Sequence, residues 1–258
     1  MSTQAAPGET LAEMIAITER AGQVAAHWFG QVTGTRKSDG SLASEADLAT
    51  EQFLMEQIGR LFPRDEICSE ETPEHRCVGS GRVWSLDPVD GTHNFIAGLG
   101  VWAVSVGRVD AGVPSLGIIH SPALGLTWAA ARGEGAWLNG KRLGPPAAGE
   151  VRRNDLVGVN SEMPPGLPRL PGKTRNLGSA ALHAGWVLSG VFRAGYFHNW
   201  VLWDLAAALC LAAEVGVEAR WPGNRLLTDL TDLGASERQG LLVLAPAGLC
   251  ESLVQGLE

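Results

Sequence analysis

The sequence predicts a protein of mixed helices and strands, and three observations lead to that fold class. Apolar residues recur at helical spacing over residues 9–30 and 44–62. Between residues 67 and 138 they gather instead in short runs that Gly, Pro and Asp interrupt. Beyond residue 149 helical and strand-like segments alternate, which favours α/β layering in that half of the chain.

Two amphipathic helices are predicted at the start of the chain. The first covers residues 9–30, where Thr10 can cap its beginning and Gly30 can end it. The second begins at Ser44, whose side chain suits a helix N-terminus, and Pro63 stops it. Each carries one apolar face, as helices that cover a core do.

Short β-rich runs follow and predict a sheet. They are Val101–Val109, Ser115–Ile119, Trp128–Ala131 and Ala136–Leu138. The Asn139-Gly140 pair after the last run is typical of a two-residue hairpin turn. Residues 83–86 form a further apolar run that we interpret as a strand, and Pro88 should end its regular pairing because proline has no backbone donor.

The composition changes most clearly at residues 144–149, which combine two prolines with small residues. We therefore predict an N-terminal α+β domain at residues 1–144 and a C-terminal α/β domain at residues 145–258. The elements predicted for the second domain are strands at Leu156–Val159, Gly190–Tyr196 and Leu241–Ala245, and helices at Ser179–Ser189 and Asp204–Glu214.

Composition and charge exclude several classes of function. The chain has 258 residues, enough for a substantial core, and its formal net charge is −8. That charge argues against a nucleic-acid-binding protein with a basic face. The longest apolar run, Leu205–Ala213, is far below the roughly 20 residues of a membrane span. We expect a cytoplasmic protein without nucleic-acid or membrane partners, whose four scattered cysteines are reduced.

The most informative segment is Asp87–Phe95, in which two carboxylates three residues apart precede a Gly-Thr turn. Oxygen ligands of this kind suit Mg²⁺, and Asp87 and Asp90 are suitably placed to share two such ions. Gly91 lets the backbone approach a ligand closely, and Thr92 adds a hydroxyl and an amide that can face an anion. These residues alone leave a surface turn as an equal alternative, since Asp-Gly is a common turn dipeptide.

Three segments together resemble the inositol monophosphatase family. They are Asp87–Phe95, Ser69–Glu71, and Trp203–Ala207 followed by Glu214 and Gly216. Softer similarity extends over Lys37–Asp47, Gly133–Gly140 and Arg175–Ala181, so the resemblance covers nearly the whole chain in the expected order. It implies a layered αβαβα sandwich of the inositol monophosphatase and fructose-1,6-bisphosphatase type.

The resemblance also implies a phosphoric monoester hydrolase with two or three Mg²⁺ ions per subunit, in a homodimer. The implied metal ligands are Glu70, Asp87, the Val89 carbonyl, Asp90 and Asp204. Gly91 and Thr92 would bind the phosphate, and Thr92 with Glu70 would orient the attacking water. Asp47 would assist beside a third ion. Water activated in this way attacks phosphorus directly, so we expect no covalent phospho-enzyme.

The substrate is less defined than the reaction. The candidate pocket residues are His93, Ser179, His183, Phe197 and His198. A small phosphorylated metabolite is expected, with inositol monophosphate as the family default. Inositol-specific members carry a glutamate where this chain has Phe197, whereas residues 101–103 and 121–124 are similar to the histidinol-phosphatase branch. Histidinol-phosphate phosphatase, nucleotide 3′-phosphatase and, in another class, a catalytically silent phosphate-ligand binding protein are the alternatives.

Overall fold

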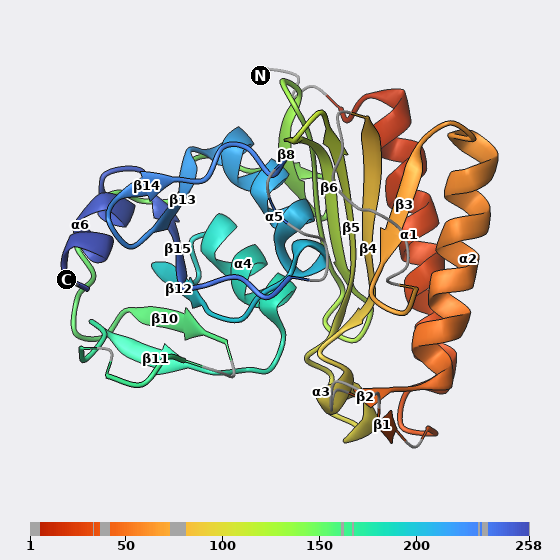
Figure 1. Ribbon diagram of the computed structural model, residues 1–258, viewed down its shortest axis with the longest axis horizontal. Helices are drawn as coiled ribbons and strands as arrows, with labels where there is room; N and C mark the ends of the chain where they lie inside the picture. The colour runs from red at the N-terminus through yellow and green to blue at the C-terminus, as the bar shows by residue number, and fades with distance from the viewer. Residues whose placement is uncertain are drawn as a thin grey trace.

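Helices and strands stack in five layers. The computed structural model describes residues 6–32, 34–36, 42–72, 81–160, 163–166, 168–231, 233 and 237–257. In Figure 1 a pair of helices, a seven-stranded sheet, a second pair of helices, a six-stranded sheet and a last helix follow one another across the molecule. This order confirms the predicted αβαβα sandwich. Within the described residues, no helix is both long enough and apolar enough to cross a membrane.

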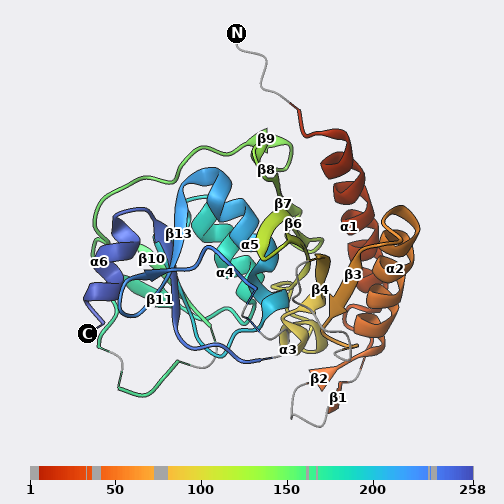
Figure 2. The ribbon, with the colours of Figure 1, turned by 45° about the horizontal axis from the view of Figure 1, so that its top comes forward.

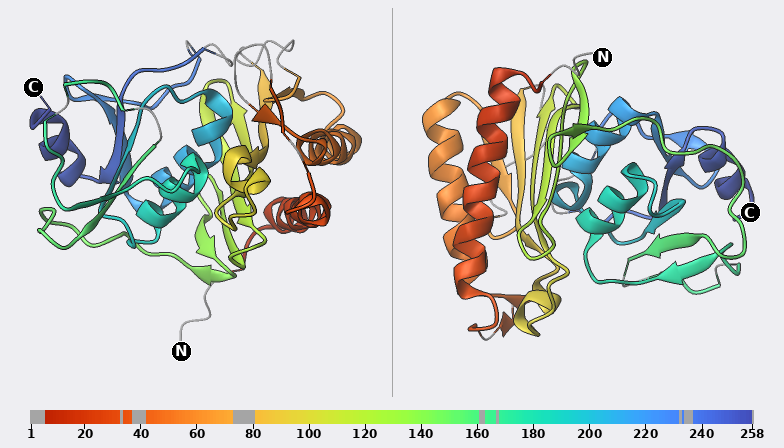
Figure 3. Two further views of the ribbon diagram at one scale, coloured as in Figure 1. Left: turned by 90° about the horizontal axis from the view of Figure 1, so that it is seen from below. Right: turned by 180° about the vertical axis from the view of Figure 1, so that it is seen from behind.

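The first layer consists of α1 (Glu9–Trp28) and α2 (Glu45–Leu61), which lie side by side on the outer face of the first sheet (Figure 3). Their buried residues recur every three or four positions, as the sequence pattern predicted. These residues pack against the strand side chains that point outward, such as Trp84 and Ile118. A short hairpin of β1 (Thr35–Arg36) and β2 (Leu42–Ala43) lies between the two helices in the chain.

The first sheet has the strand order β3-β4-β5-β6-β7-β8-β9. Its strands are β3 (Glu66–Ser69), β4 (Arg82–Asp90), β5 (Ala103–Asp110), β6 (Val113–Ser121), β7 (Leu126–Ala131), β8 (Gly135–Leu138) and β9 (Lys141–Arg142). Asn139 and Gly140 both have positive φ, 49° and 74°, which confirms the predicted hairpin turn. Both faces of the sheet are buried, so its central strands read as apolar runs without strict alternation.

The predicted end of regular pairing at Pro88 is confirmed, although the strand itself continues to Asp90. Its pairing with β5 shifts register there, because Asp87 faces Ser105 whereas Asp90 faces Ala103. The bulge accommodates a proline, which cannot donate to the ladder, and it bends the end of the strand where two carboxylates stand.

The second sheet has the order β11-β10-β12-β15-β13-β14 and mixes parallel with antiparallel pairs. Its strands are β10 (Leu156–Val159), β11 (Lys173–Arg175), β12 (Ala194–Phe197), β13 (Val217–Trp221), β14 (Arg225–Leu226) and β15 (Leu242–Pro246). The strand predicted from Gly190 begins only at Ala194, because Gly190 with φ 75° still belongs to the end of the preceding helix. The last helix, α6 (Leu249–Gln255), covers the outer face of this sheet (Figure 2).

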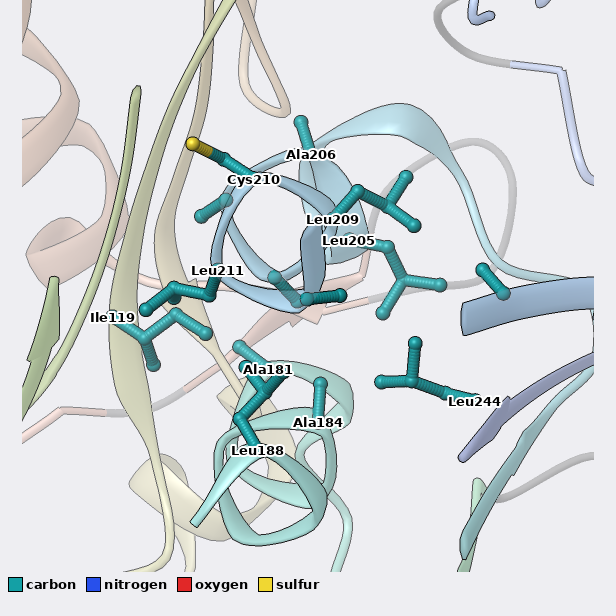
Figure 4. Close-up of a cluster of buried hydrophobic side chains, with 14 of the residues drawn as sticks. Ile119, Ala181, Ala184, Leu188, Leu205, Ala206, Leu209, Cys210, Leu211 and Leu244 are labelled. Carbon is teal, nitrogen blue, oxygen red and sulfur yellow. The ribbon is translucent and has the colours of Figure 1, made fainter. Parts of the chain in front are cut away.

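The middle layer, α4 (Ala180–Leu188) and α5 (Leu202–Val215), is packed between the two sheets. Figure 4 shows their apolar side chains between Ile119 of the first sheet and Leu244 of the second. The helix α5 lies very close to the first sheet. A Cβ built on Gly117 would stand 2.1 Å from the Ala207 carbonyl oxygen, so only glycine fits there.

The cysteines depart in part from expectation. Cys68 is buried and disulfide-bonded, so the prediction of reduced thiols is wrong for this residue. The sequence has no CxxC pair or close cluster that would signal such a bond, and a disulfide depends on spatial proximity. Cys210 and Cys250 are free and buried, as predicted, and Cys77 lies outside the described residues.

Candidate metal centre

Three aspartates from distant parts of the chain meet between the two sheets. Asp87 and Asp90 stand at the bulged end of β4, and Asp204 stands in the first turn of α5. One carboxylate oxygen from each lies within 4.8 Å of those from the other two. The structure thus brings together three of the five predicted metal ligands, across more than a hundred residues of sequence.

The cluster is buried and strongly anionic. Asp87 is only 2% exposed and Asp90 only 7%. Burial, reinforced by neighbouring carboxylates with Glu70 foremost, raises the pKa of Asp87 well above its usual range. Burial also raises the pKa of Asp90 to about 6. Burial and the charge of Asp90 raise the pKa of Asp204. Burying several carboxylates next to one another is unfavourable because their negative charges repel and lose hydration. Such a cluster is typical of a site that binds a cation.

The hydrogen bonds of the three carboxylates leave them with different capacities to bind a cation. A carboxylate has about four acceptor positions. Asp90 uses three, for the hydroxyl of Ser179 and the amides of Ala180 and Ala181. Among the residues that the structure describes, Asp87 accepts a single hydrogen bond, from the Val89 amide at 3.1 Å, and its other acceptor positions are enough to contact two ions.

Asp204 and Asp47 are held locally by the helices that carry them. Asp204, the third residue of α5, accepts a hydrogen bond of 2.9 Å from the Val201 amide. Asp47, in the same position of α2, accepts from the amide and the hydroxyl of Ser44 at 2.8 and 2.6 Å. This reach back to the start of the helix fixes the side chain before any tertiary contact is made.

The turn after β4 connects the aspartates with a short helix, α3 (Thr92–Ile96). Gly91 has φ 93°, a left-handed conformation that glycine adopts readily. The Thr92 hydroxyl donates to the Val89 carbonyl at 3.0 Å and lies 3.4 Å from Asp47. Glu70 is partly buried next to β4, and its charge acts on all three clustered aspartates.

The predicted substrate pocket needs correction. Phe197 and His183 have no exposed surface and so offer nothing for a substrate to contact. Phe197 belongs to the core between the sheets, and His183 lies beside Trp186 and Phe192. Burial lowers the pKa of His183 to about 4. His93 is exposed and His198 partly buried, so for these two a pocket role stays a prediction.

Several contributors to the site were not predicted from the sequence. The backbone amides of Ala180 and Ala181 donate to Asp90. The side-chain amide of Asn94 donates to the Val101 and Leu177 carbonyls at 2.7 Å each. The Ser-Ala-Ala pattern signals a helix start but says nothing of a partner ninety residues away. Lys37 and Ser41, which belong to the segment of softer similarity to the family, lie outside the described residues.

The donor set fits a hard divalent cation. Every candidate ligand is an oxygen, and the clustered carboxylates have free acceptor positions and mutually repelling charges. When bound, such ions neutralise a phosphate and make a bound water more acidic. A layered α/β frame with this anionic centre between its halves is typical of a metal-dependent enzyme.

Comparison with known proteins agrees with that class. The model of the inositol monophosphatase family matches residues 8–255. A fructose-1,6-bisphosphatase/inositol-1-monophosphatase of Thermotoga maritima is 32% identical over 199 residues, covering 74% of this chain and 75% of its own. A histidinol-phosphatase of Chlorobaculum parvum is 31% identical over 210 residues, covering 78% and 81%. A solved IMPase/NADP phosphatase superposes with a TM-score of 0.81 at 18% identity, covering 97% of each chain.

The chain therefore belongs to the inositol monophosphatase family. It is a phosphoric monoester hydrolase that acts on small phosphorylated substrates, and its family is metal-dependent.

Proposed function

We propose that this phosphatase hydrolyses a small phosphate monoester with the aid of Mg²⁺, and that inositol monophosphate is the first substrate to test. The observation that carries the proposal is the buried cluster of Asp87, Asp90 and Asp204. Its oxygen ligands suit Mg²⁺, which keeps several waters and is completed by phosphate oxygens. The IMPase/NADP phosphatase of similar fold is complexed with Mg²⁺ and phosphate, which supports this choice of ion.

In this proposal the carboxylates divide two ions between them. Asp87 would contact both, in keeping with its free acceptor positions. Asp90 and Asp204 would help to hold one ion, and Glu70 with the Val89 carbonyl would help to hold the other. A third ion near Asp47 belongs to the proposal as well.

The residues after β4 are proposed to handle the phosphate and the water. The Gly91 and Thr92 amides bind the phosphate. The Thr92 hydroxyl has a single proton, which the Val89 carbonyl accepts at 3.0 Å. Its oxygen therefore keeps a lone pair that can accept a hydrogen bond from water. With Glu70 as the second partner, such a water presents its own lone pair to phosphorus.

Histidinol phosphate is the second candidate substrate. The relative from Chlorobaculum parvum is named a histidinol-phosphatase. Phe197 stands where inositol-specific members carry a glutamate, and its apolar side chain is fully buried. A polyol hydroxyl left without that acceptor costs roughly 1–3 kcal/mol, which weakens the case for inositol. Nucleotide 3′-phosphates are the third candidate.

We also propose a homodimer in the cytoplasm. Light scattering after size-exclusion chromatography tests the first part, because a single peak at the mass of one 27.2 kDa chain contradicts it.

The decisive experiment is phosphate release from these esters with Mg²⁺ and with excess EDTA, for the wild type and for Asp90→Asn. We expect one ester class to be hydrolysed, and both EDTA and the substitution to abolish the reaction. Activity that survives both treatments would contradict the metal mechanism. A wild type that binds phosphate esters without hydrolysing any of them would instead be the silent binding protein.

A further inference from the structure

Residues 177–181 contact residues 90–94 through hydrogen bonds and close backbone packing, and we call this set of contacts the clasp. Asp90 accepts hydrogen bonds from the Ser179 hydroxyl and from the first two amides of α4. The side-chain amide of Asn94 donates to the Leu177 carbonyl at 2.7 Å. A Cβ built on Gly91 would lie 3.1 Å from the Gly178 carbonyl oxygen, so the two backbones touch. The clasp therefore joins the second half of the chain to the segment that ends β4.

The bonds of Ser179 leave little capacity for a substrate. Its hydroxyl proton is donated to Asp90. Its oxygen accepts the Leu182 amide at 3.2 Å, which caps α4. The side chain is also only 2% exposed. A buried hydroxyl that already donates one hydrogen bond and accepts another orients its protein partners, rather than binding a ligand from solvent.

These bonds also fix how Asp90 can meet a cation. Two of its three donors bind Oδ2, and the third binds Oδ1. Oδ1 therefore keeps the freer position, and the carboxylate cannot rotate without breaking hydrogen bonds to α4. Asp90 is accordingly presented to the cluster in one orientation.

We propose that Ser179, with the first turn of α4, is a positioning residue that orients Asp90 for the metal, and that it is not a substrate-contact residue. The inference rests on the metal centre of the proposed function and adds to it. The second half of the chain contributes to metal binding twice, through Asp204 as a ligand and through the clasp as a support. Loss of such a supporting hydrogen bond typically weakens metal binding 10- to 100-fold.

The test compares Ser179→Gly and Ser179→Ala with Ser189→Ala. Glycine is tolerated at helix N-caps, so Ser179→Gly removes the hydroxyl with little cost to α4. Ser189 donates to the Gly185 carbonyl at 2.8 Å at the other end of the same helix, far from the clasp in sequence. The control therefore removes a hydroxyl from α4 without touching Asp90.

Three quantities are measured for each variant: the Mg²⁺ concentration for half-maximal activity, the rise in Tm that Mg²⁺ produces without substrate, and KM at saturating Mg²⁺. We expect the Ser179 variants to need about tenfold more Mg²⁺, by both activity and Tm, with KM within about twofold of the wild type. Ser189→Ala should match the wild type in all three.

Two results would overturn the inference while leaving the metal centre in place. One is a Mg²⁺ requirement of the Ser179 variants equal to that of Ser189→Ala. The other is a raised KM with an unchanged Mg²⁺ requirement, which makes Ser179 a substrate contact. The Tm measurement needs no substrate, so it still decides if the wild type hydrolyses none of the esters. If the Tm of the wild type does not respond to Mg²⁺, the proposed metal centre is contradicted, and this inference fails with it.

Discussion

Two kinds of helix start hold the carboxylates of this site. In α2 and α5 the acidic residue belongs to the helix and accepts a hydrogen bond from the residue just before the helix, as Asp47 does from Ser44 and Asp204 from Val201. The start of α4 instead binds Asp90, which arrives from a strand ninety residues earlier. A locally held carboxylate is oriented by its own helix, whereas a remotely held one is oriented only when the two halves of the chain are packed together.

The largest expected effect is that of Asp204→Asn and Asp90→Asn, which compare a locally held carboxylate with a remotely held one. Both should lower activity roughly 100-fold or more, because a metal ion contributes several kcal/mol to catalysis. Their metal-free stabilities should differ. An asparagine at 204 still accepts the Val201 amide, whereas one at 90 has a single oxygen for three donors.

Thermal melting in EDTA measures this difference. We expect Asp204→Asn to melt above Asp90→Asn, since unpaired buried donors cost about 1–3 kcal/mol. The reverse order would mean that α4 does not depend on Asp90.

The next effect concerns pH and the remote helix start. His183 accepts the Leu177 amide at 3.0 Å, and its pKa is lowered to about 4 by burial. Between pH 6.5 and 4, His183 binds a proton in the unfolded chain but stays neutral in the folded chain, so the free energy of unfolding falls as the pH falls through this range. The loss approaches about 3 kcal/mol below pH 4.

Urea unfolding of the wild type and of His183→Gln, compared at each pH, isolates this contribution from that of the aspartates. The wild type should lose stability relative to the variant on acidification. Parallel curves would show that His183 is protonated in the folded protein.

A smaller effect is expected for Asn94→Ala, which removes a donor shared by the Val101 and Leu177 carbonyls. We expect a loss of about 2 kcal/mol in the free energy of unfolding. The isosteric Asn94→Asp should be no better, because a carboxylate cannot donate. Full stability of the aspartate variant would mean that packing, and not the two hydrogen bonds, holds the clasp.

The smallest effect belongs to a local helix start. Ser44→Ala removes the hydroxyl hydrogen bond that Ser44 donates to Asp47 and keeps the one from the Ser44 amide. The cost should be about 1 kcal/mol, or roughly 2–4 °C in Tm for a chain of this size. The Mg²⁺ requirement should change less than in Ser179→Gly. An equal change would erase the distinction between local and remote support.

The same distinction explains what the sequence predicted. The helices α1, α2, α4 and α5 and most of the central strands follow from periodicity and local signals. The metal ligands follow from short motifs, because Asp87 and Asp90 are close in the chain and the family pattern adds Asp204. The clasp could not be predicted, since its partners are ninety residues apart. Phe197 was assigned to the pocket because inositol-specific members carry a glutamate there, and the family pattern does not show that every residue of β12 is buried in this chain.

The closeness of α5 to the first sheet has a consequence for how the chain can be divided. The glycines at 107 and 117 let this helix lie directly on β5 and β6, and Glu214 at its far end accepts the amides of Gly133 and Gly135 at 2.8 Å each. A fragment that ended at the composition break near residue 144 would lose the helix that covers one face of its sheet. We therefore expect the two predicted domains to depend on each other for folding.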